Sequence, residues 1–395
     1  MKIVALTKEE FDNFAYHHKY STYYQTSAYA ETSRYEGLNT FYIGFVQDNE
    51  LVGVTLFLHK TIYLYYKYAY APRGFLIDYT DKKLVKNIKH SRVFCGDIKE
   101  FLRVCASECD SSKTTLINAL VGFGGLVPSK LAGELGFNLA LANKESLVAG
   151  GAFLDTAKIT PIDSEHFGLK FLLFSKLAEP KRLIITASGG AVVDIKSPKK
   201  IASLSPKKAL KHPNWNMGAK ITIDSASMAN KLFEVLEAYH LYGIKNIDAL
   251  IERTSKVHAI VGFDDGSSTA HISLPDMRLA IAHALSLAGN SRIPSQTKQV
   301  LPDFDFLGAK FTFERISLKK YPIFSLKNEV LKKPKSGVII NAANDVMVAR
   351  FLAGKCTFGD IAKNILKIYE KYNNIDISSF EDVLEADLMI RKVLK

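Results

Sequence analysis

The chain has 395 residues, enough for two or three domains with substantial cores, and 47% hydrophobic and 23% charged residues exclude a disordered protein. Its formal net charge of +12 is spread along the chain. The densest basic stretches, 196–211 and 332–335, lack the interleaved aromatic residues typical of nucleic-acid binding. We therefore expect no nucleic-acid partner.

The sequence carries no sign of export or membrane insertion. Charged residues come early in the first ten positions, which leaves no apolar core for a signal peptide. No apolar run reaches the ~20 residues of a membrane-spanning helix. The four cysteines have no metal-site spacing and read as free thiols: Cys95, Cys105, Cys109 and Cys356. We expect a cytoplasmic protein with no membrane partner.

Residues 1–90 are crowded with Tyr and Phe. Alternating apolar residues predict strands over 41–46 and 51–59, joined by a hairpin turn, and a further aromatic strand over 63–70. Aromatic residues in strands mostly serve packing. Taken alone, the aromatic residues of this segment therefore predict packing within a strand-rich head.

The next part of the chain has the pattern of a βαβ unit in a parallel sheet. It predicts, in order, a strand, a glycine turn, a helix and a strand: 116–122, 124–125, 129–135 and 139–142. Asn143, Lys144 and Glu145 follow the last strand, where open α/β sheets bind ligands. Taken alone, these residues fit an ordinary polar turn before a helix, with Ser146 near the cap, better than they fit a ligand site.

Asp163 and Glu165 are the first candidates for metal binding. They alternate in the segment 161–167, so on an extended chain both side chains point the same way. Two neighbouring carboxylates repel unless a proton or a cation lies between them. With Glu234 they form an oxygen set suited to Mg²⁺ or Mn²⁺ rather than zinc. Solvated surface carboxylates are the commoner explanation of such a pair.

A short segment between Pro213 and Gly218 has the composition of a mobile, partly apolar flap. It contains the only tryptophan of the chain, Trp215, together with Met217, and His212 precedes it directly. Such flaps often close over a ligand.

After the flap, the run 221–223 predicts a short strand, and Ser225 or Ser227 is expected to cap the following helix. An amide, an ammonium group and a carboxylate lie within the first turns of that helix: Asn230, Lys231 and Glu234. A hydroxyl and free N–H groups at a helix start, followed by an amide and an ammonium group, can hold a phosphate. A capped amphipathic helix with an ordinary polar face is the alternative.

The remaining elements follow the same reasoning. A strand over 183–186 leads into Ala187-Ser-Gly-Gly190, where Ser188 and flexible glycines can contact a phosphate. The later pattern predicts a hairpin, a linker and a helical end: 258–263 with 268–274, then 286–310, then 341 onward. Thr357 and a capping box of Ser378 with Glu381 mark helix starts.

The string from His212 to Glu234 resembles, nearly residue for residue, the signature of the 1-deoxy-D-xylulose 5-phosphate reductoisomerase family. The resemblance begins near Val93 and runs to the C-terminus. It implies an α/β fold with a truncated Rossmann-like nucleotide domain, an α/β catalytic domain and a C-terminal helical domain. It also implies a homodimer that uses NADPH and Mg²⁺ or Mn²⁺ to convert the phosphorylated sugar to 2-C-methyl-D-erythritol 4-phosphate in non-mevalonate isoprenoid biosynthesis.

The resemblance also implies roles for individual residues. The residues implied as catalytic are Lys144, Asp163, Glu165, His212 and Glu234, of which Asp163, Glu165 and Glu234 bind the metal. The substrate is implied to contact Lys144, Ser164, Glu165, Ser188, His212, Trp215, Met217, Ser225, Asn230, Lys231 and Glu234. The cofactor is implied to contact Asn143, Glu145 and Gly218.

The chain departs from this family at its N-terminus. Family members begin with a strand and a glycine-rich phosphate loop, and residues 1–90 contain no such loop. Instead, 23–27 and 70–78 resemble the start of the FemAB-like aminoacyltransferases that build peptidoglycan bridges, whose domains are acetyltransferase-like. A smaller departure lies at 191–193, where Ala-Val-Val replaces the family's usual Pro-Phe-Arg.

The expected domains are a head, a nucleotide-domain remnant, a catalytic domain, a linker and a helical domain: 1–90, 91–160, 161–290, 291–310 and 311–395. Three functions fit this arrangement. The chain is an active reductoisomerase, a substrate-binding fusion impaired by the missing phosphate loop, or an aminoacyltransferase fragment that acts on peptidoglycan precursors. Metal-dependent binding of a phosphonate substrate mimic separates the first two from the third.

Overall fold

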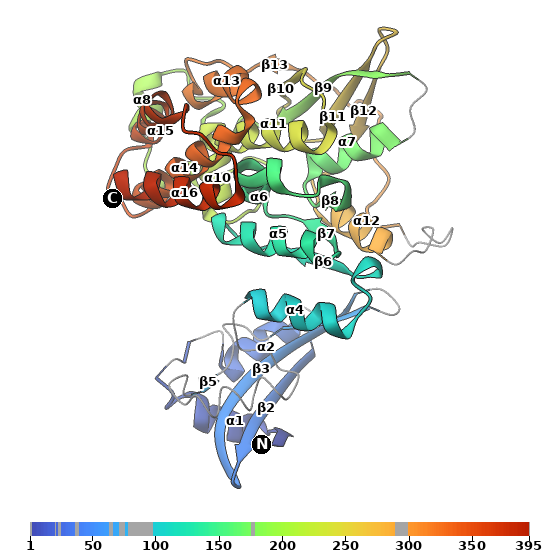
Figure 1. Ribbon diagram of the computed structural model, residues 1–395, viewed down its shortest axis with the longest axis vertical. Coiled ribbons are helices and arrows are strands. Elements are labelled where there is room, and N and C mark those ends of the chain that lie inside the picture. Colours follow the sequence, from blue (N-terminus) through green and yellow to red (C-terminus); the bar gives the residue numbers. More distant parts are fainter. Residues whose placement is uncertain are drawn as a thin grey trace. The chain divides into compact units, whose positions relative to one another are not determined.

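The computed structural model (Figure 1) describes residues 2–19, 21–22, 25–35, 39–62, 66–70, 76–77, 98–174, 178–288 and 299–394. The chain divides into two compact units, Met1–Phe101 and Leu102–Lys395. None of the described helices is long and apolar enough to cross a membrane.

The first unit is built on an antiparallel sheet in the order β1-β2-β3-β4, with β5 paired to β3. Its elements are β1 Lys2–Ala5, α1 Lys8–Ala15, α2 Ser27–Tyr35, β2 Asn39–Gln47, β3 Glu50–Ile62, β4 Tyr66–Tyr70 and β5 Leu76–Ile77. The predicted hairpin is confirmed, and Asp48 and Asn49 make its turn with φ of 51° and 63°. The segments 23–27 and 70–78, which resemble aminoacyltransferases, are described only in part. Residues 23–24, 71–75 and 78 lie outside the described residues.

A parallel three-stranded sheet in the order β6-β7-β8 opens the second unit. Helix α4 Ile98–Glu108 spans the boundary between the two units. The elements that follow it are β6 Thr115–Asn118, α5 Leu126–Glu134, β7 Asn138–Leu141, α6 Lys144–Gly150 and β8 Ile159–Pro161. The predicted βαβ unit is confirmed. The first strand ends at Asn118 rather than at Gly122, because the Asn118 amide donates to the carbonyl of Gly125 and turns the chain toward α5.

A second sheet, in the order β12-β11-β9-β10-β13, lies further along the chain. Its strands are β9 Pro180–Ala187, β10 Ile247–Ile251, β11 Val257–Phe263, β12 Ser268–Ile272 and β13 Glu314–Arg315, and β11 and β12 form the predicted hairpin. Helices α7 Ser164–Phe174 and α11 Ala229–Tyr242 pack against this sheet, whereas α12 Arg278–Ala288 packs against β7 and β8 of the parallel sheet. Three shorter helices lie between β9 and α11: α8 Pro198–Ala202, α9 Pro206–Ala209 and α10 Ala219–Ser227.

Helix α11 is the centre of this unit. Every residue from Ala229 to Ala238 is buried, and the helix contacts α6, β9, β10 and α14 (Figure 1). A helix buried on all sides must satisfy its polar side chains internally. Its polar residues therefore need partners from neighbouring elements.

The C-terminal part is helical, as predicted. It contains α13 Lys327–Lys332, α14 Gly337–Leu352, α15 Phe358–Tyr372 and α16 Phe380–Val393. Short 3-10 turns connect elements throughout the unit: η2 Ser111–Lys113, η3 Phe123–Gly125, η4 Gly151–Phe153, η5 Thr156–Lys158, η6 Gly190–Val192, η7 Pro322–Leu326 and η8 Pro334–Ser336. Thr357 caps α15 as predicted, whereas α16 is capped by Ser379 with Asp382, one position after the predicted pair. In the predicted linker, α12 extends to Ala288, 289–298 lie outside the described residues, and 299–310 contain no helix or strand.

Two predictions about local structure are wrong. Residues 221–223 are helical within α10, where Ile223 is fully buried. Neither serine caps α11, because Ser225 lies inside α10 and α11 starts after Met228, whose φ of 66° breaks the chain between the two helices. Ser227 only approaches the start of α11, with its hydroxyl 3.4 Å from the backbone nitrogen of Ala229.

The expected extended segment 161–167 is also wrong beyond its first residues. Strand β8 ends at Pro161 and α7 begins at Ser164. Asp163 accepts hydrogen bonds from the backbone nitrogens of Glu165 and His166, at 3.1 Å and 3.2 Å, and so caps this helix.

Candidate active site

One cavity of about 280 Å³ collects most of the predicted site residues. The predicted residues that line it are Lys144, Asp163, Ser164, Glu165, Ser188, His212, Trp215, Met217, Ser225, Asn230, Lys231 and Glu234. They come from the ends of β7, β8 and β9, the flap, α10 and α11. The predicted cofactor residues Asn143, Glu145 and Gly218 do not line this cavity.

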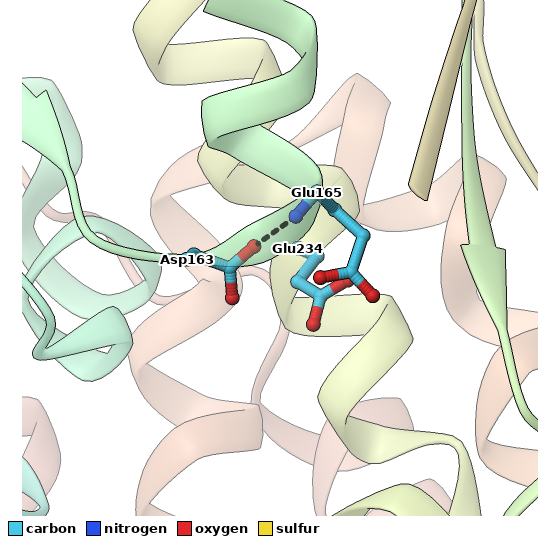
Figure 2. A group of neighbouring side chains, drawn as sticks. All are labelled: Asp163, Glu165 and Glu234. Atoms are coloured by element: carbon cyan, nitrogen blue, oxygen red, sulfur yellow. Dashed lines mark hydrogen bonds between the residues drawn. The ribbon is translucent and has the colours of Figure 1, made fainter. Parts of the chain in front are cut away.

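Three carboxylates converge in the cavity, as Figure 2 shows. Asp163 precedes α7, Glu165 lies in its first turn, and Glu234 comes from α11. One oxygen of each lies within 4.8 Å of the others. The capping role of Asp163 holds its carboxylate beside Glu165, and the buried helix α11 supplies the third group.

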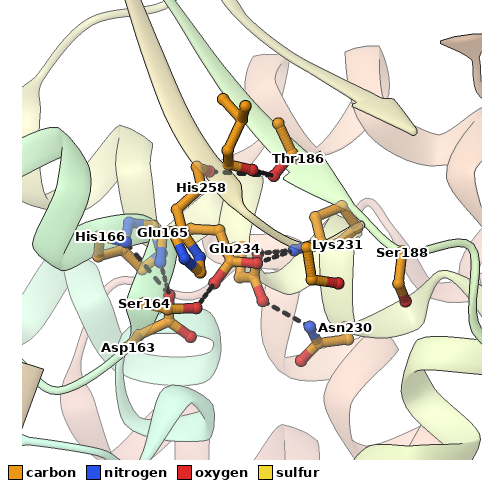
Figure 3. A network of polar contacts seen from close by, with 12 residues as sticks. Asp163, Ser164, Glu165, His166, Thr186, Ser188, Asn230, Lys231, Glu234 and His258 are labelled. Carbon is orange, nitrogen blue, oxygen red and sulfur yellow. Dashed lines mark hydrogen bonds and ion pairs between the residues drawn. The ribbon is translucent and has the colours of Figure 1, made fainter. Parts of the chain in front are cut away.

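Two lysine side chains extend into this group of carboxylates. The Lys144 ammonium group donates to Asn230 Oδ1 at 2.7 Å and to Asp163 and Glu234 at 3.2 Å. The Lys231 ammonium group lies 2.6 Å from Glu165 and 2.5 Å from Glu234 (Figure 3). The two ammonium groups thus act as cations that partly neutralise the three carboxylates.

Burial and charge shift the pKa values of these groups. Burial, reinforced by the charge of Glu165, raises the pKa of Glu234 to about 7. Burial opposes the charge on Lys144, but Asp163 and Glu234 hold its pKa well above the usual value. Burial likewise opposes ionisation of Asp163, and the Lys144 ammonium group keeps its pKa below the usual value. The cluster therefore holds more negative charge than two lysines neutralise.

The donor set fits a hard divalent cation. All three groups offer carboxylate oxygens, the ligands preferred by Mg²⁺ and Mn²⁺. Glu234 Oε2 is buried and makes no hydrogen bond of good geometry, although the Lys231 ammonium group lies 2.5 Å from it. The raised pKa of Glu234 marks a carboxylate that another cation would stabilise.

Ser188 and His212 form the opposite wall. His212 Nδ1 accepts from the backbone nitrogen of Trp215 at 2.9 Å, so in the neutral ring Nε2 carries the proton and donates to Ser188 Oγ at 2.9 Å. Burial, with the nearby charge of Lys231, lowers the pKa of His212 to about 4 and keeps the ring neutral. Ser188 Oγ also accepts from the backbone nitrogen of Gly190 at 3.1 Å. Its own proton remains available for a ligand oxygen.

The flap, defined as residues 212–218, closes one side of the cavity. The Asn214 amide donates to the carbonyl of Arg253 at 2.7 Å and to Ser255 Oγ at 2.8 Å. The Trp215 ring lies edge-on to His258, with 6.4 Å between ring centroids. The flap is thus tied to the end of β10 and to β11 by a few polar and aromatic contacts.

Of the predicted cofactor residues, Asn143 and Glu145 follow β7 at the carboxyl edge of the parallel sheet, whereas Gly218 is the N-cap of α10. Asn143 uses its whole amide internally, because it caps α6 through Ser146 and donates to the carbonyls of Leu120 and Gly122 and to Glu145. Its contact with NADPH, and those of Glu145 and Gly218, remain predictions.

The loop beside Asn143 has features that a dinucleotide needs. The side chains of Leu120 and Val121 are 49% and 79% exposed, which gives an apolar surface at the sheet edge. Gly124 has open space where a Cβ would lie, so a ligand can approach the backbone there. The described residues of this sheet therefore fit one part of NADPH.

Several residues near the site were not predicted. His258 lines the cavity beside Glu165, and His166 lies 3.4 Å from Glu237 beneath the carboxylates. Burial opposes the charge on His166, yet Glu237 raises its pKa to about 8. His166 directly follows Glu165, which could have singled it out, whereas no local signal identifies His258. Lys220, at the start of α10, was missed because its partners Glu145 and Asp345 are distant in sequence.

Comparisons with known proteins agree with this site. Residues 75–151 match the family model "1-deoxy-D-xylulose 5-phosphate reductoisomerase", and residues 159–242 match the C-terminal domain model of the same enzyme. Residues 272–393 match the model "DXP reductoisomerase C-terminal domain", and residues 6–93 match the FemAB family.

Curated relatives extend the agreement over most of the chain. The 1-deoxy-D-xylulose 5-phosphate reductoisomerase of Campylobacter fetus subsp. fetus (strain 82-40) is 55% identical, covering 80% of this chain and 85% of the relative. The 1-deoxy-D-xylulose 5-phosphate reductoisomerase of Campylobacter hominis is 54% identical, covering 79% of this chain and 83% of the relative.

Solved structures are similar as well. A DOX-P reductoisomerase in complex with NADPH, fosmidomycin and magnesium has a TM-score of 0.68 at 32% identity, covering 79% of this chain and 82% of that one. The Zymomonas mobilis enzyme in complex with NADPH has a TM-score of 0.66 at 30% identity, covering 80% and 83%. With its carboxylate cluster in place and this similarity over four fifths of its length, the chain belongs to the 1-deoxy-D-xylulose 5-phosphate reductoisomerase family.

Proposed function

We propose that this chain converts 1-deoxy-D-xylulose 5-phosphate to 2-C-methyl-D-erythritol 4-phosphate, using NADPH and Mg²⁺ or Mn²⁺. The observation that carries this proposal is the cavity in which three carboxylates, two lysines and the Ser188–His212 pair meet. Similar proteins have been solved with NADPH, fosmidomycin and magnesium. The same ligand classes fit the groups described here.

In this proposal Asp163, Glu165 and Glu234 hold the metal, which when bound polarises the carbonyl of the substrate. Lys144 and Ser164 place the substrate's hydroxyl groups beside it. Ser164 donates its hydroxyl proton to Glu165 at 2.5 Å, which keeps it next to the metal ligands.

The phosphate of the substrate would lie against Ser188, Ser225, Asn230 and Lys231. Lys231 can leave Glu165 and Glu234 once another cation neutralises those carboxylates, because the electrostatic attraction that holds its ammonium group between them is then weaker. Because Ser188 Oγ accepts hydrogen bonds from His212 and Gly190, its own hydroxyl proton can be donated to a phosphate oxygen. The chain thus links metal binding to the release of its own phosphate-binding lysine.

The flap would cover the bound substrate through His212, Trp215 and Met217, all of which line the cavity. Covering the substrate excludes water and strengthens the electrostatic interactions inside. His212 stays neutral at physiological pH because its pKa is near 4, so it acts here as a hydrogen-bond donor rather than a charge.

The NADPH part of the proposal rests on Asn143, Glu145, Gly218 and the loop that follows β6. Residues 1–90 lack the family's glycine-rich phosphate loop, and each lost backbone hydrogen bond to a charged oxygen is worth ~1.5–3 kcal/mol. This absence favours a second candidate function, a substrate-binding protein with little turnover.

One experiment separates the two candidates. The purified chain is given 1-deoxy-D-xylulose 5-phosphate, NADPH and either Mg²⁺ or Mn²⁺, and NADPH consumption and product are measured. Metal-dependent consumption with 2-C-methyl-D-erythritol 4-phosphate as product supports the enzyme. Saturable binding of a phosphonate substrate analogue without any NADPH consumption would support the second candidate, a substrate-binding protein, instead. Failure to bind the analogue with metal present would contradict both.

We also propose that the chain forms a homodimer in the cytoplasm. Strand β12 is the outer strand of the second sheet, and Ser268, Thr269 and Ala270 on it are exposed. The family resemblance places the dimer contact at this sheet. Light scattering after size exclusion should give twice the monomer mass of 43.9 kDa, and cell fractionation tests the location.

A further inference from the structure

Lys220 lies directly behind the flap, in the first turn of α10, and does not line the active-site cavity. Its ammonium group contacts three carboxylates: Asp224 at 2.8 Å, Glu145 at 3.1 Å and Asp345 at 3.3 Å. Burial opposes its charge, but these carboxylates hold the pKa of Lys220 above its usual value. The ammonium group is therefore a fixed cation at the base of the flap.

The three carboxylates belong to three different helices. Glu145 lies on α6, Asp224 on α10 and Asp345 on α14. Asp345 is held from the other side by Arg391 of α16 at 2.7 Å. Asp224 receives a hydrogen bond of 2.7 Å from the Asn344 amide. Lys220 thus ties the start of α10 to α6 and to the C-terminal helices.

Through Glu145 this contact reaches the metal cluster. Glu145 is the sequence neighbour of Lys144, whose ammonium group contacts Asp163, Asn230 and Glu234. The first turn of α6 is consequently held on one side by the carboxylate cluster and on the other side by Lys220. The first turn of α6 therefore connects the base of the flap to the carboxylate cluster, through the ionic contact of Glu145 with Lys220 and those of Lys144 with Asp163 and Glu234.

We propose that Lys220, acting through Glu145, is a positioning residue that holds the flap in register with the metal and substrate groups. Without its ammonium group, Glu145, Asp224 and Asp345 would face one another in a largely buried space and repel. Their separation shifts the start of α10, and with it the flap that α10 anchors. The inference deepens the proposed function, because it concerns how the flap meets the substrate.

The test uses Trp215, the only tryptophan of the chain, which lies in the flap. Two variants weaken the contact: Lys220→Met, and Glu145→Gln, which keeps the side-chain size and leaves Lys220 two carboxylate partners. Asp387→Asn is the control, because Asp387 is a buried carboxylate of the same ionic network that pairs with Arg391 and does not touch Lys220. Circular dichroism establishes which variants are folded.

The first measurement needs no ligand, so it stands apart from the proposed function. Acrylamide quenching of Trp215 should rise about twofold in Lys220→Met and in Glu145→Gln, and stay at the wild-type value in Asp387→Asn. Wild-type quenching in both Lys220→Met and Glu145→Gln would overturn the inference. If Lys220→Met fails to fold, Glu145→Gln alone decides.

The second measurement separates positioning from general damage. Affinity for Mn²⁺ should stay within about threefold of wild type, since the three ligands remain, while affinity for a phosphonate substrate analogue falls about tenfold and KM rises more than kcat falls. Parallel losses of metal and analogue affinity would overturn the positioning role. A wild-type chain that binds no analogue would instead contradict the proposed function, and the quenching result would still decide the role of Lys220.

Discussion

Replacing Glu234 with Gln should separate metal binding from stability. Any cation among the three carboxylates lies close to all of them, because their oxygens are within 4.8 Å of one another. A carboxylate and a unit positive charge about 4 Å apart attract by about 4 kcal/mol at an effective dielectric constant of about 20. Because Glu234 also gives up its contacts with Lys144 and Lys231 when metal binds, part of this energy is lost. We expect Mn²⁺ affinity to fall by about 100-fold or more.

The stability of the metal-free protein should change little. Removing one member of a buried ion pair usually costs about 3–5 kcal/mol, because a charge is left without its partner. Here the variant leaves two carboxylates, Asp163 and Glu165, beside two ammonium groups, Lys144 and Lys231, so the charges balance. The raised pKa of Glu234 points the same way, because the folded protein already disfavours its charge. We expect the metal-free unfolding free energy to stay within about 1 kcal/mol of wild type.

Calorimetric titration with Mn²⁺ and denaturant unfolding without metal measure the two quantities. Glu237→Gln is the matched control, since Glu237 is a buried carboxylate one turn further along α11 that pairs with His166 outside the cluster. It should keep Mn²⁺ affinity within about threefold of wild type. The reasoning is refuted if Glu234→Gln binds Mn²⁺ as tightly as wild type, or if Glu237→Gln loses as much affinity.

Three further predictions concern single side chains. Burial lowers the pKa of His240 from 6.5 to about 4, so between these values the unfolded chain binds a proton that the folded chain does not, and stability is lost as pH falls. His240→Gln should therefore reduce the stability loss between pH 7 and pH 5 by roughly 1–2 kcal/mol in denaturant titrations, and an unchanged loss contradicts this. Ser379→Ala should cost about 1 kcal/mol of unfolding free energy and Ser378→Ala much less, because Ser379 caps α16, and a larger cost for Ser378→Ala would favour the cap predicted from sequence. Ser188→Ala should raise the KM of the phosphorylated substrate about tenfold with a smaller change in kcat, measured by NADPH consumption, and an unchanged KM would argue against a phosphate contact at Ser188.

The convergence of the three carboxylates could be predicted from the sequence, although the geometry behind that prediction was wrong. Asp163 and Glu165 were placed together by assuming an extended chain. In the structure they converge because Asp163 caps α7 and Glu165 occupies its first turn. An extended chain places residues two positions apart on one side, whereas here the capping side chain of Asp163 turns back over the first turn of α7 and so lies beside Glu165. The correct pairing therefore did not depend on the correct element.

The helix α10 shows where short patterns fail. Three residues, 221–223, are too few to distinguish a period of 2 from one of 3.6, and their β-branched side chains favour a strand locally. Burial of Ile223 in the core and the hydrogen bond from Thr222 to the carbonyl of Gly218 stabilise the helix instead. Neither contact can be read from three residues, since the first depends on distant elements and the second on where the helix begins.

Lys220 could not be assigned from sequence because its partners lie 75 residues before it and 125 residues after it, at Glu145 and Asp345. Local spacing predicts only its pair with Asp224, four residues on, which is an ordinary helix contact. The helix start at Thr357 was easier to predict, because the Thr357 hydroxyl accepts its hydrogen bond from the backbone nitrogen of Asp360, only three residues on. Predictability from this sequence therefore follows the separation between the groups that interact.

The active site departs from the rules that stable protein cores follow. Buried charges normally pair one to one, yet Glu234 is 1% exposed and shares Lys231 with Glu165. A fold selected for stability alone would have replaced one of these carboxylates with a neutral side chain. The excess of negative charge is tolerated because the surrounding helices, and α11 above all, are held by apolar packing that does not depend on it. That packing lets the cavity keep an arrangement of charges that a divalent cation completes.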